Sequence, residues 1–72
     1  MVVLYSTNSP ICMSLEKKII DKHIPYLLIT GTDALTLIKE KGYNSAPLLE
    51  NDNIVMTYES ATQWIKNLGG SK

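Results

Sequence analysis

The amino-acid sequence predicts a single α/β domain with a four-stranded mixed sheet and helices on both faces. In the first half of the chain, apolar runs of strand length alternate with amphipathic stretches of helix length. In the second half, two short apolar runs lie close together before a last amphipathic stretch. The predicted order is therefore strand, helix, strand, helix, strand, strand, helix. The whole chain, 1–72, suffices for one domain, near the lower size limit for folding on its own core.

The first predicted strand is the apolar run 1–5, which is rich in β-branched residues and lacks alternation. A helix is expected from Pro10 to about Lys22, because Ser9 is a good N-cap and proline suits the first helical position. Its apolar face is expected to consist of Ile11, Leu15 and Ile19, with Cys12 and Ile20 beside it. Pro25 ends the helical stretch, because proline disfavours the helical conformation in the residue before it.

The second strand is expected at residues 26–29, buried and parallel to the first, which completes a strand–helix–strand unit. Residues 30–33 are predicted to form a turn in which Thr32 or Asp33 caps a short helix. The apolar residues of that helix are Ala34, Leu35, Leu37 and Ile38. Gly42 is expected to end it.

The last three elements are a hairpin and a helix. Residues 47–50 and 53–56 are predicted as short strands around a tight turn at Asn51-Asp52. Thr57 is expected to cap the last helix, whose apolar face is made of Tyr58, Ala61, Ile65 and Leu68, with Trp64 flanking it. Gly69-Gly70 should end this helix, and Ser71-Lys72 should be frayed.

Composition argues against several classes of function. Basic and acidic residues balance to a formal charge of zero, so we expect no nucleic-acid partner. No apolar run approaches a membrane span and the start lacks a signal-peptide pattern, so we expect a cytoplasmic protein without membrane association, and a monomer. The single cysteine cannot form an internal disulfide. No second ligand type lies at a matching spacing from His23, so no metal is expected.

The stretch Tyr5–Ser14 is where chemistry is expected. If the helix begins at Pro10, Cys12 is its third residue, and its sulfur lies near free backbone N–H groups and the positive end of the helix dipole. Such surroundings stabilise a thiolate. A lone cysteine is more often a small buried apolar residue, but its place at a helix start after a strand favours a functional role.

This strand, turn and helix resemble the active-site turn of the glutaredoxins, a family with a thioredoxin-like fold. The family's turn usually reads Cys-Pro-X-Cys, and this chain reads Ser9-Pro10-Ile11-Cys12. The segment 42–47 resembles the family's Gly-X-X-Thr-Val-Pro loop, whose proline follows a cis peptide bond. The segment 56–59 resembles the one that holds the γ-glutamyl end of glutathione. The order of elements is also the one expected of a thioredoxin-like fold.

The resemblance implies a glutathione-dependent thiol–disulfide oxidoreductase, with glutathione as co-substrate and no metal. It also implies glutathionylated or disulfide-containing proteins as partners. Ser9 takes the nucleophile's position and Cys12 that of the resolving thiol. The implied glutathione-binding residues are Asn8, Ser9, Pro10, Ile11, Ser45, Ala46, Pro47, Thr57, Tyr58 and Glu59. Among them, Thr57 and Tyr58 would offer backbone N–H groups to a carboxylate, and Glu59 would take the ammonium.

Simpler interpretations of the same residues stay open. Pro47 can be a trans proline that opens an edge strand, where no N–H is needed. Thr57 can simply cap a helix, and Glu59 can simply suit its dipole. Two departures from the family pattern weaken the expected hold on the glycyl carboxylate of glutathione: Val55-Met56 replaces a frequent Gly-Gly pair, and Ser6 replaces a frequent basic residue.

Serine at position 9 is the main departure. A hydroxyl has a much higher pKa than a thiol and forms no disulfide, so this chain cannot cycle a dithiol. Ser9 is an experimental replacement of cysteine, a replacement of selenocysteine, or natural. Two other functions stay open: an electron-donor redoxin for ribonucleotide reductase, and a non-catalytic module that binds glutathione or a peptide. The segment Thr57–Glu59 favours glutathione over the redoxin.

Overall fold

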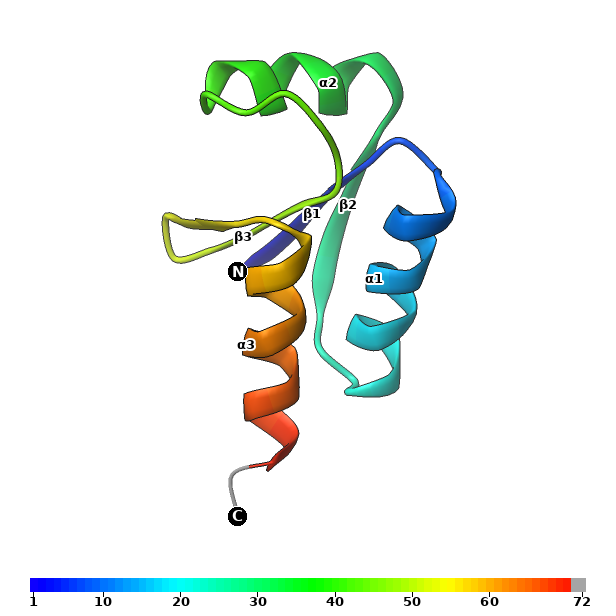
Figure 1. Ribbon diagram of the computed structural model, residues 1–72, viewed down its shortest axis with the longest axis vertical. Coiled ribbons are helices and arrows are strands. Elements are labelled where there is room, and N and C mark those ends of the chain that lie inside the picture. The colour runs from blue at the N-terminus through cyan, green and yellow to red at the C-terminus, as the bar shows by residue number, and fades with distance from the viewer. Residues whose placement is uncertain (71–72) are drawn as a thin grey trace.

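The computed structural model describes residues 1–70 and has the predicted order of elements (Figure 1). The strands are β1 (Val2–Ser6), β2 (Tyr26–Thr30), β3 (Leu48–Asn51) and β4 (Ile54–Met56). The helices are α1 (Pro10–Asp21), α2 (Gly31–Glu40) and α3 (Tyr58–Gly70). The two residues expected to fray, Ser71 and Lys72, lie outside the described part. Across residues 1–70, no helix combines the length and apolar character needed to cross a membrane.

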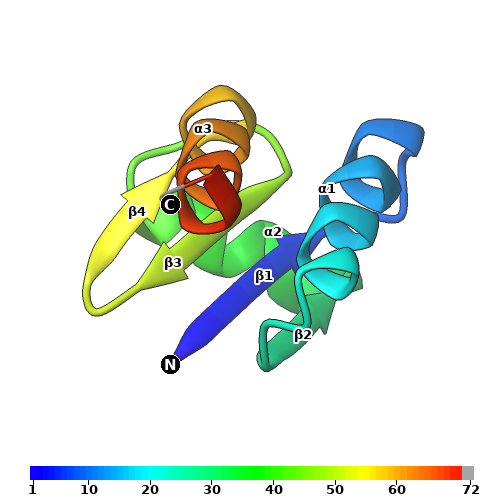
Figure 2. The same ribbon diagram turned by 90° about the horizontal axis from the view of Figure 1, so that it is seen from below.

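The four strands form one mixed sheet in the order β2-β1-β3-β4, which Figure 2 shows from right to left. The central strand β1 is parallel to β2 and antiparallel to β3, and β3 and β4 form an antiparallel hairpin. Successive side chains of β1 point to opposite faces. Leu4 packs with α1 and α3, whereas Tyr5 packs with α2. Helices therefore cover both faces, as the sequence predicted.

Each face of the sheet has its own buried cluster. Under α1 and α3 the cluster consists of Val2, Leu4, Leu15, Ile19, Leu49, Met56, Ala61 and Ile65. Under α2 it consists of Tyr5, Ala34, Ile38 and Leu48. Beside this second cluster, the Tyr5 hydroxyl donates to the Glu50 carboxylate at 2.7 Å, and Lys41 Nζ lies 3.0 Å from the same carboxylate oxygen. This half-buried group ties the end of α2 to β3.

Helix α1 begins at Pro10 with Ser9 as its N-cap, as predicted, but its buried face is different. Cys12 lies in the buried stripe with Leu15 and Ile19, whereas Ile11 is 45 % exposed. Ile11 and Cys12 both have helical spacing to Leu15 and Ile19, so periodicity alone could not decide which of the two faces the sheet. The prediction that Ile11 is part of the buried face was therefore wrong, and Ile11 lies on the side of α1 that faces α3.

The prediction of a buried second strand was wrong. β2 is an edge strand, and Leu27 and Leu28 are 50 % and 42 % exposed. The predicted turn at 30–33 is also absent, because α2 begins at Gly31, directly after β2. Gly31 has φ +70°, which lets the chain change direction within one residue. The N-cap is therefore Thr30, and it makes no side-chain capping bond.

The hairpin between β3 and β4 turns one residue later than predicted. Its central residues are Asp52 and Asn53, with φ +53° and +70°, and Asn51 pairs with Ile54. Two central residues with positive φ are typical of a tight hairpin turn that matches the twist of the strands. The last helix continues through the glycine pair that was expected to end it. Gly42, with φ +88°, follows α2 as predicted.

Candidate functional site

The turn between β1 and α1 brings Ser9 and Cys12 together. Asn8 has φ +63°, and its N–H donates to the Ser6 hydroxyl at 3.1 Å. After this bend, Ser9 Oγ donates to Cys12 Sγ at 3.2 Å and accepts the Cys12 N–H at 3.4 Å. The side chain at position 9 therefore faces the sulfur three residues later, in the first turn of α1.

The sulfur of Cys12 is buried but well provided with hydrogen-bond donors. Burial raises the pKa of the Cys12 thiol, but the Ser9 hydroxyl, the backbone of Thr7 and the hydroxyls of Thr7 and Ser6 lower it, and the net pKa lies below its usual value. The side chain has no exposed surface. Hydrogen bonds thus favour the thiolate at a sulfur that has no exposed surface in this structure.

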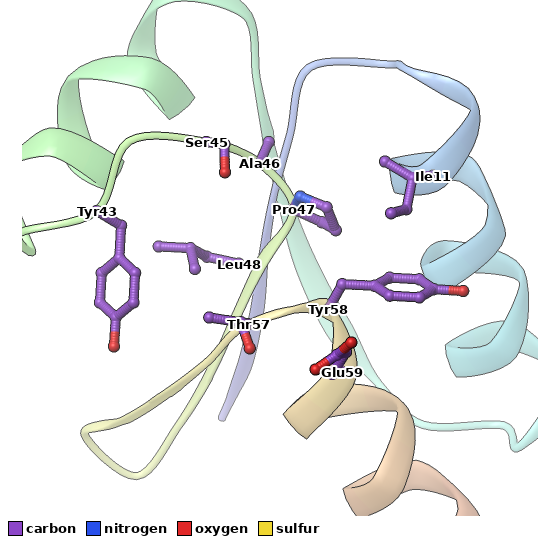
Figure 3. Close-up of a pocket in the computed structure, with 9 residues that line it drawn as sticks. All are labelled: Ile11, Tyr43, Ser45, Ala46, Pro47, Leu48, Thr57, Tyr58 and Glu59. Carbon is purple, nitrogen blue, oxygen red and sulfur yellow. The ribbon is translucent and has the colours of Figure 1, made fainter.

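A groove of about 320 Å³ lies beside this turn, at the start of β3 and of α3 (Figure 3). The Ala46–Pro47 peptide bond within it is cis, as the sequence predicted. The residues that line the groove are Ile11, Tyr43, Ser45, Ala46, Pro47, Leu48, Thr57, Tyr58 and Glu59. They come from the first turn of α1, the loop between α2 and β3, and the beginnings of β3 and α3. Segments far apart in the sequence therefore meet at one concave surface.

Most of the predicted glutathione-binding residues line this groove. Those that do not are Asn8, Ser9 and Pro10, which lie on the adjoining turn. Sequence reasoning missed Tyr43 and Leu48. Leu48 is the first residue of β3, directly after Pro47, and Tyr43 is an aromatic residue between the glycine that follows α2 and the cis proline. An aromatic residue in a short loop was the available signal for Tyr43.

Tyr58 and Ile11 form one wall of the groove. Figure 3 shows the Tyr58 ring extending toward α1 beneath Ile11, with Tyr43 at the opposite end. The Tyr58 hydroxyl lies 3.5 Å from Ser14 Oγ, within hydrogen-bonding distance, so the ring links α3 to α1. This link holds the start of α3 next to the thiol turn.

The floor of the groove combines backbone donors with one carboxylate. The first hydrogen bond within α3 runs from the Ala61 N–H to the Thr57 carbonyl at 2.8 Å. The N–H groups before Ala61 have no acceptor inside the helix and are available to an anion. Glu59 is the one charged side chain among the lining residues. The groove can therefore bind a carboxylate and an ammonium group within one helical turn.

The described residues offer no obvious place for a metal. Within residues 1–70, no three side chains of the histidine, cysteine, aspartate or glutamate type gather as a ligand set. Comparison with known proteins adds no assignment, because no family model, no curated protein and no solved structure matches the chain. Functional inference therefore depends on the groove and the thiol turn.

Proposed function

We propose that this chain is a glutaredoxin-like domain with a thioredoxin-like fold. In this proposal it is the scaffold of a glutathione-dependent thiol–disulfide oxidoreductase, with Ser9 in the place of the nucleophilic cysteine. The observation that carries the proposal is the groove beside the Ser9–Cys12 turn. Most of the binding residues implied by the family resemblance line this groove. A cytoplasmic location and disulfide-containing protein partners belong to the same proposal.

The groove supports binding of glutathione in a defined direction. The γ-glutamyl end carries both a carboxylate and an ammonium group, which suit the N–H groups at the start of α3 and the Glu59 carboxylate. The middle of the ligand would lie over Pro47, against the wall formed by Ile11 and Tyr58. Its sulfur would then point toward position 9, two residues before Ile11 in the same turn.

A thiol at position 9 would carry out disulfide exchange in two balanced steps. Its thiolate would attack the glutathione sulfur of a mixed disulfide, form a new bond to that sulfur, and release the substrate as a thiolate. A second glutathione thiolate would then attack the bound glutathione sulfur, give glutathione disulfide and restore the thiolate at position 9. Cys12 Sγ lies 3.2 Å from Ser9 Oγ, close enough to act as an alternative resolving thiol. The Ser9 hydroxyl supports neither step.

A second candidate is a non-catalytic module that binds glutathione or a peptide. Ser9 itself favours it, because the hydroxyl already has a structural role as the cap of α1 and as a donor to Cys12 Sγ. The groove is complete without a thiol at position 9. The two candidates therefore share the ligand site and differ only in turnover.

The test compares this chain with Ser9→Cys in the reduction of a small glutathione mixed disulfide, coupled to glutathione reductase. We expect turnover from Ser9→Cys and none from the Ser9 form. Backbone amide shifts on titration with glutathione are followed in parallel at Ala46, Thr57 and Tyr58. Shifts without turnover in a folded Ser9→Cys protein would leave the binding module. If these amides stay unchanged while distant ones move, the glutathione site is wrong.

A further inference from the structure

β2 is an outer strand of the sheet, and nothing in its sequence protects its free edge. Its five residues, Tyr26–Thr30, include no charge and no proline, and they pair with β1 residue by residue without a bulge. An edge strand presents a row of unpaired N–H and C=O groups, and proteins usually shield such edges with charges, prolines, bulges or short strands. The edge of β2 has none of these features.

On the face of the sheet that α1 covers, apolar side chains border the free edge of β2. Leu28 points to that face, as does its register partner Leu4. The flank of α1 next to β2 is identified by Glu16, whose carboxylate accepts the Tyr26 hydroxyl at 2.6 Å. Met13 and Ile20 lie on the same flank by helical spacing, and they are 58 % and 52 % exposed.

On the face of α2, a second apolar surface borders the same edge. A groove of about 380 Å³ is lined by Ile29 of β2 and by Asp33, Thr36 and Leu37 of α2. Leu27 is on this face and half exposed, because successive residues of a strand alternate between faces. Apolar surface therefore continues around both sides of the β2 edge.

The opposite edge of the sheet is different. β4 has only three residues, Ile54–Met56, and it follows directly on the tight turn at Asp52-Asn53. Ile54 is 63 % exposed there, but a strand this short offers few backbone groups to a neighbour. The contrast identifies β2 as the edge suited to receive another strand.

We propose that the occupant of this edge is a second copy of the chain, which adds its own β2 antiparallel to β2 and joins two sheets into one. Antiparallel pairing about Leu28, the middle residue of β2, gives a two-fold symmetric contact. It brings the end of β2 that follows Lys22 and His23 to the end that precedes Asp33 in the other copy.

Charge favours a second copy over an unrelated strand. In an antiparallel pair, Lys22 before β2 in one copy approaches the end of β2 that precedes Asp33 in the other. The acidic side chains near Lys22 are already engaged: Asp21 is paired with Lys17 at 3.4 Å, and the Glu16 carboxylate accepts the Tyr26 hydroxyl. The formal net charge is zero, so two copies do not repel each other. This proposal replaces the monomer expected from the sequence. It is independent of the proposed function, since the groove beside the Ser9–Cys12 turn lies on the other flank of α1.

The first test is sedimentation velocity over a concentration series. We expect a reversible dimer, which Leu28→Lys weakens at least tenfold, because two lysines would face each other across the two-fold axis. Ile54→Lys is the matched control on the opposite edge and should leave association unchanged. Circular dichroism and urea unfolding show whether both variants are folded. A monomer at every concentration, or equal weakening by both folded variants, overturns the proposal.

The second test is cross-linking through position 28. Directly opposed residues of antiparallel strands have Cβ atoms about 4.5–5.5 Å apart, near the range that a disulfide spans. With copper–phenanthroline, two thiols of Leu28→Cys would lose two protons and two electrons to oxygen and form one bond between copies. Ile54→Cys is the control, and it carries the same buried Cys12. Covalent dimers in Leu28→Cys alone are expected. Their absence, or equal yields in both variants, contradicts pairing at β2.

Discussion

Helix α1 separates two apolar surfaces that differ in the polar groups they offer. On the side of Ile11 lies the groove, built from segments far apart in the sequence and equipped with helix-start N–H groups, hydroxyls and the Glu59 carboxylate. On the side of Met13 and Ile20 lies the edge of β2, one continuous segment that offers its backbone N–H and C=O groups in a row. Groups that converge on a point suit a small ligand, whereas groups in a row suit a strand.

The two surfaces share one support, the buried stripe of α1. Cys12, Leu15 and Ile19 hold the helix against the sheet, and each has no exposed surface. A change in this stripe should therefore affect both surfaces, and a change on one flank should affect only one. The predictions that follow test this division, beginning with the largest expected effect.

Leu15→Ala should damage both surfaces at once. Removing a fully buried leucine side chain leaves a cavity and is expected to lower the free energy of unfolding by about 2–5 kcal/mol. Urea denaturation measures this loss. Met13→Ala, on the exposed edge flank of the same helix, should change stability by no more than about 0.5 kcal/mol. A loss below about 1 kcal/mol for Leu15→Ala would contradict the position of the stripe.

Ser9→Ala should act on the groove side alone. Loss of the N-cap is expected to lower the free energy of unfolding by about 1 kcal/mol, and loss of the hydroxyl donor should raise the pKa of the Cys12 thiol. Urea denaturation and the pH dependence of thiolate absorbance measure the two effects. Ser9→Gly separates them, because glycine caps a helix almost as well but also lacks the hydroxyl. Self-association should be the same for the Ser9 chain, Ser9→Ala and Ser9→Gly. A change in self-association would contradict the separation of the groove side from the edge side.

The groove side of the molecule was more predictable than the edge side. Ser9-Pro10 predicted where α1 begins, because capping depends on local residue types. The family resemblance named most of the residues that line the groove. Helix rotation and strand position depend on contacts made elsewhere. Ile11 and Cys12 both fit a helical stripe, and only the packing of α1 on the sheet selects Cys12.

The edge character of β2 could not be predicted from its residues. Leu27 and Leu28 belong to an apolar run that suits a central strand as well as an edge strand. The sequence pattern alone does not tell these two positions in the sheet apart. The predicted hairpin turn was one residue too early for a similar reason, because Asn51-Asp52 and Asp52-Asn53 are both good turn pairs. Local chemistry narrowed these alternatives, and long-range pairing decided between them.

Glu59→Gln sharpens the comparison from the groove side. The change removes the groove's carboxylate, so glutathione binding followed by amide shifts should weaken about tenfold, through loss of a charge-assisted contact with the ammonium group. Stability should fall by no more than about 1 kcal/mol, because Glu59 is in the first turn of α3 and suits its dipole. Glu40→Gln, which changes net charge equally at the end of α2, is the control. Equal affinities for the two variants would exclude Glu59 from the site.

The smallest expected effect is a pH dependence of stability that comes from Cys12. Its pKa in the folded protein is lowered, so between that pKa and the unfolded value of about 8.5 the unfolded chain binds more protons. Stability from the thiolate should therefore rise with pH through this window, be complete above it, and be lost as pH falls through the folded pKa. The measurement is the difference in unfolding free energy between the Ser9 chain and its Cys12→Ala variant, from about pH 6 to about pH 9.

Subtracting the stability of Cys12→Ala from that of the Ser9 chain removes the contributions of other titrating groups. These include Tyr5, whose pKa is raised by burial and by its bond to Glu50. The rise in stability with pH should be smaller in Ser9→Ala than in the Ser9 chain, because the Ser9 hydroxyl is the largest of the contributions that lower the thiol pKa. It should be unchanged in Leu28→Lys, where only the β2 edge is altered. A difference that stays flat or falls with pH would mean that the turn does not stabilise the thiolate. The polar groups of the groove side would then be structural, and the contrast between the two flanks of α1 would lose its chemical basis.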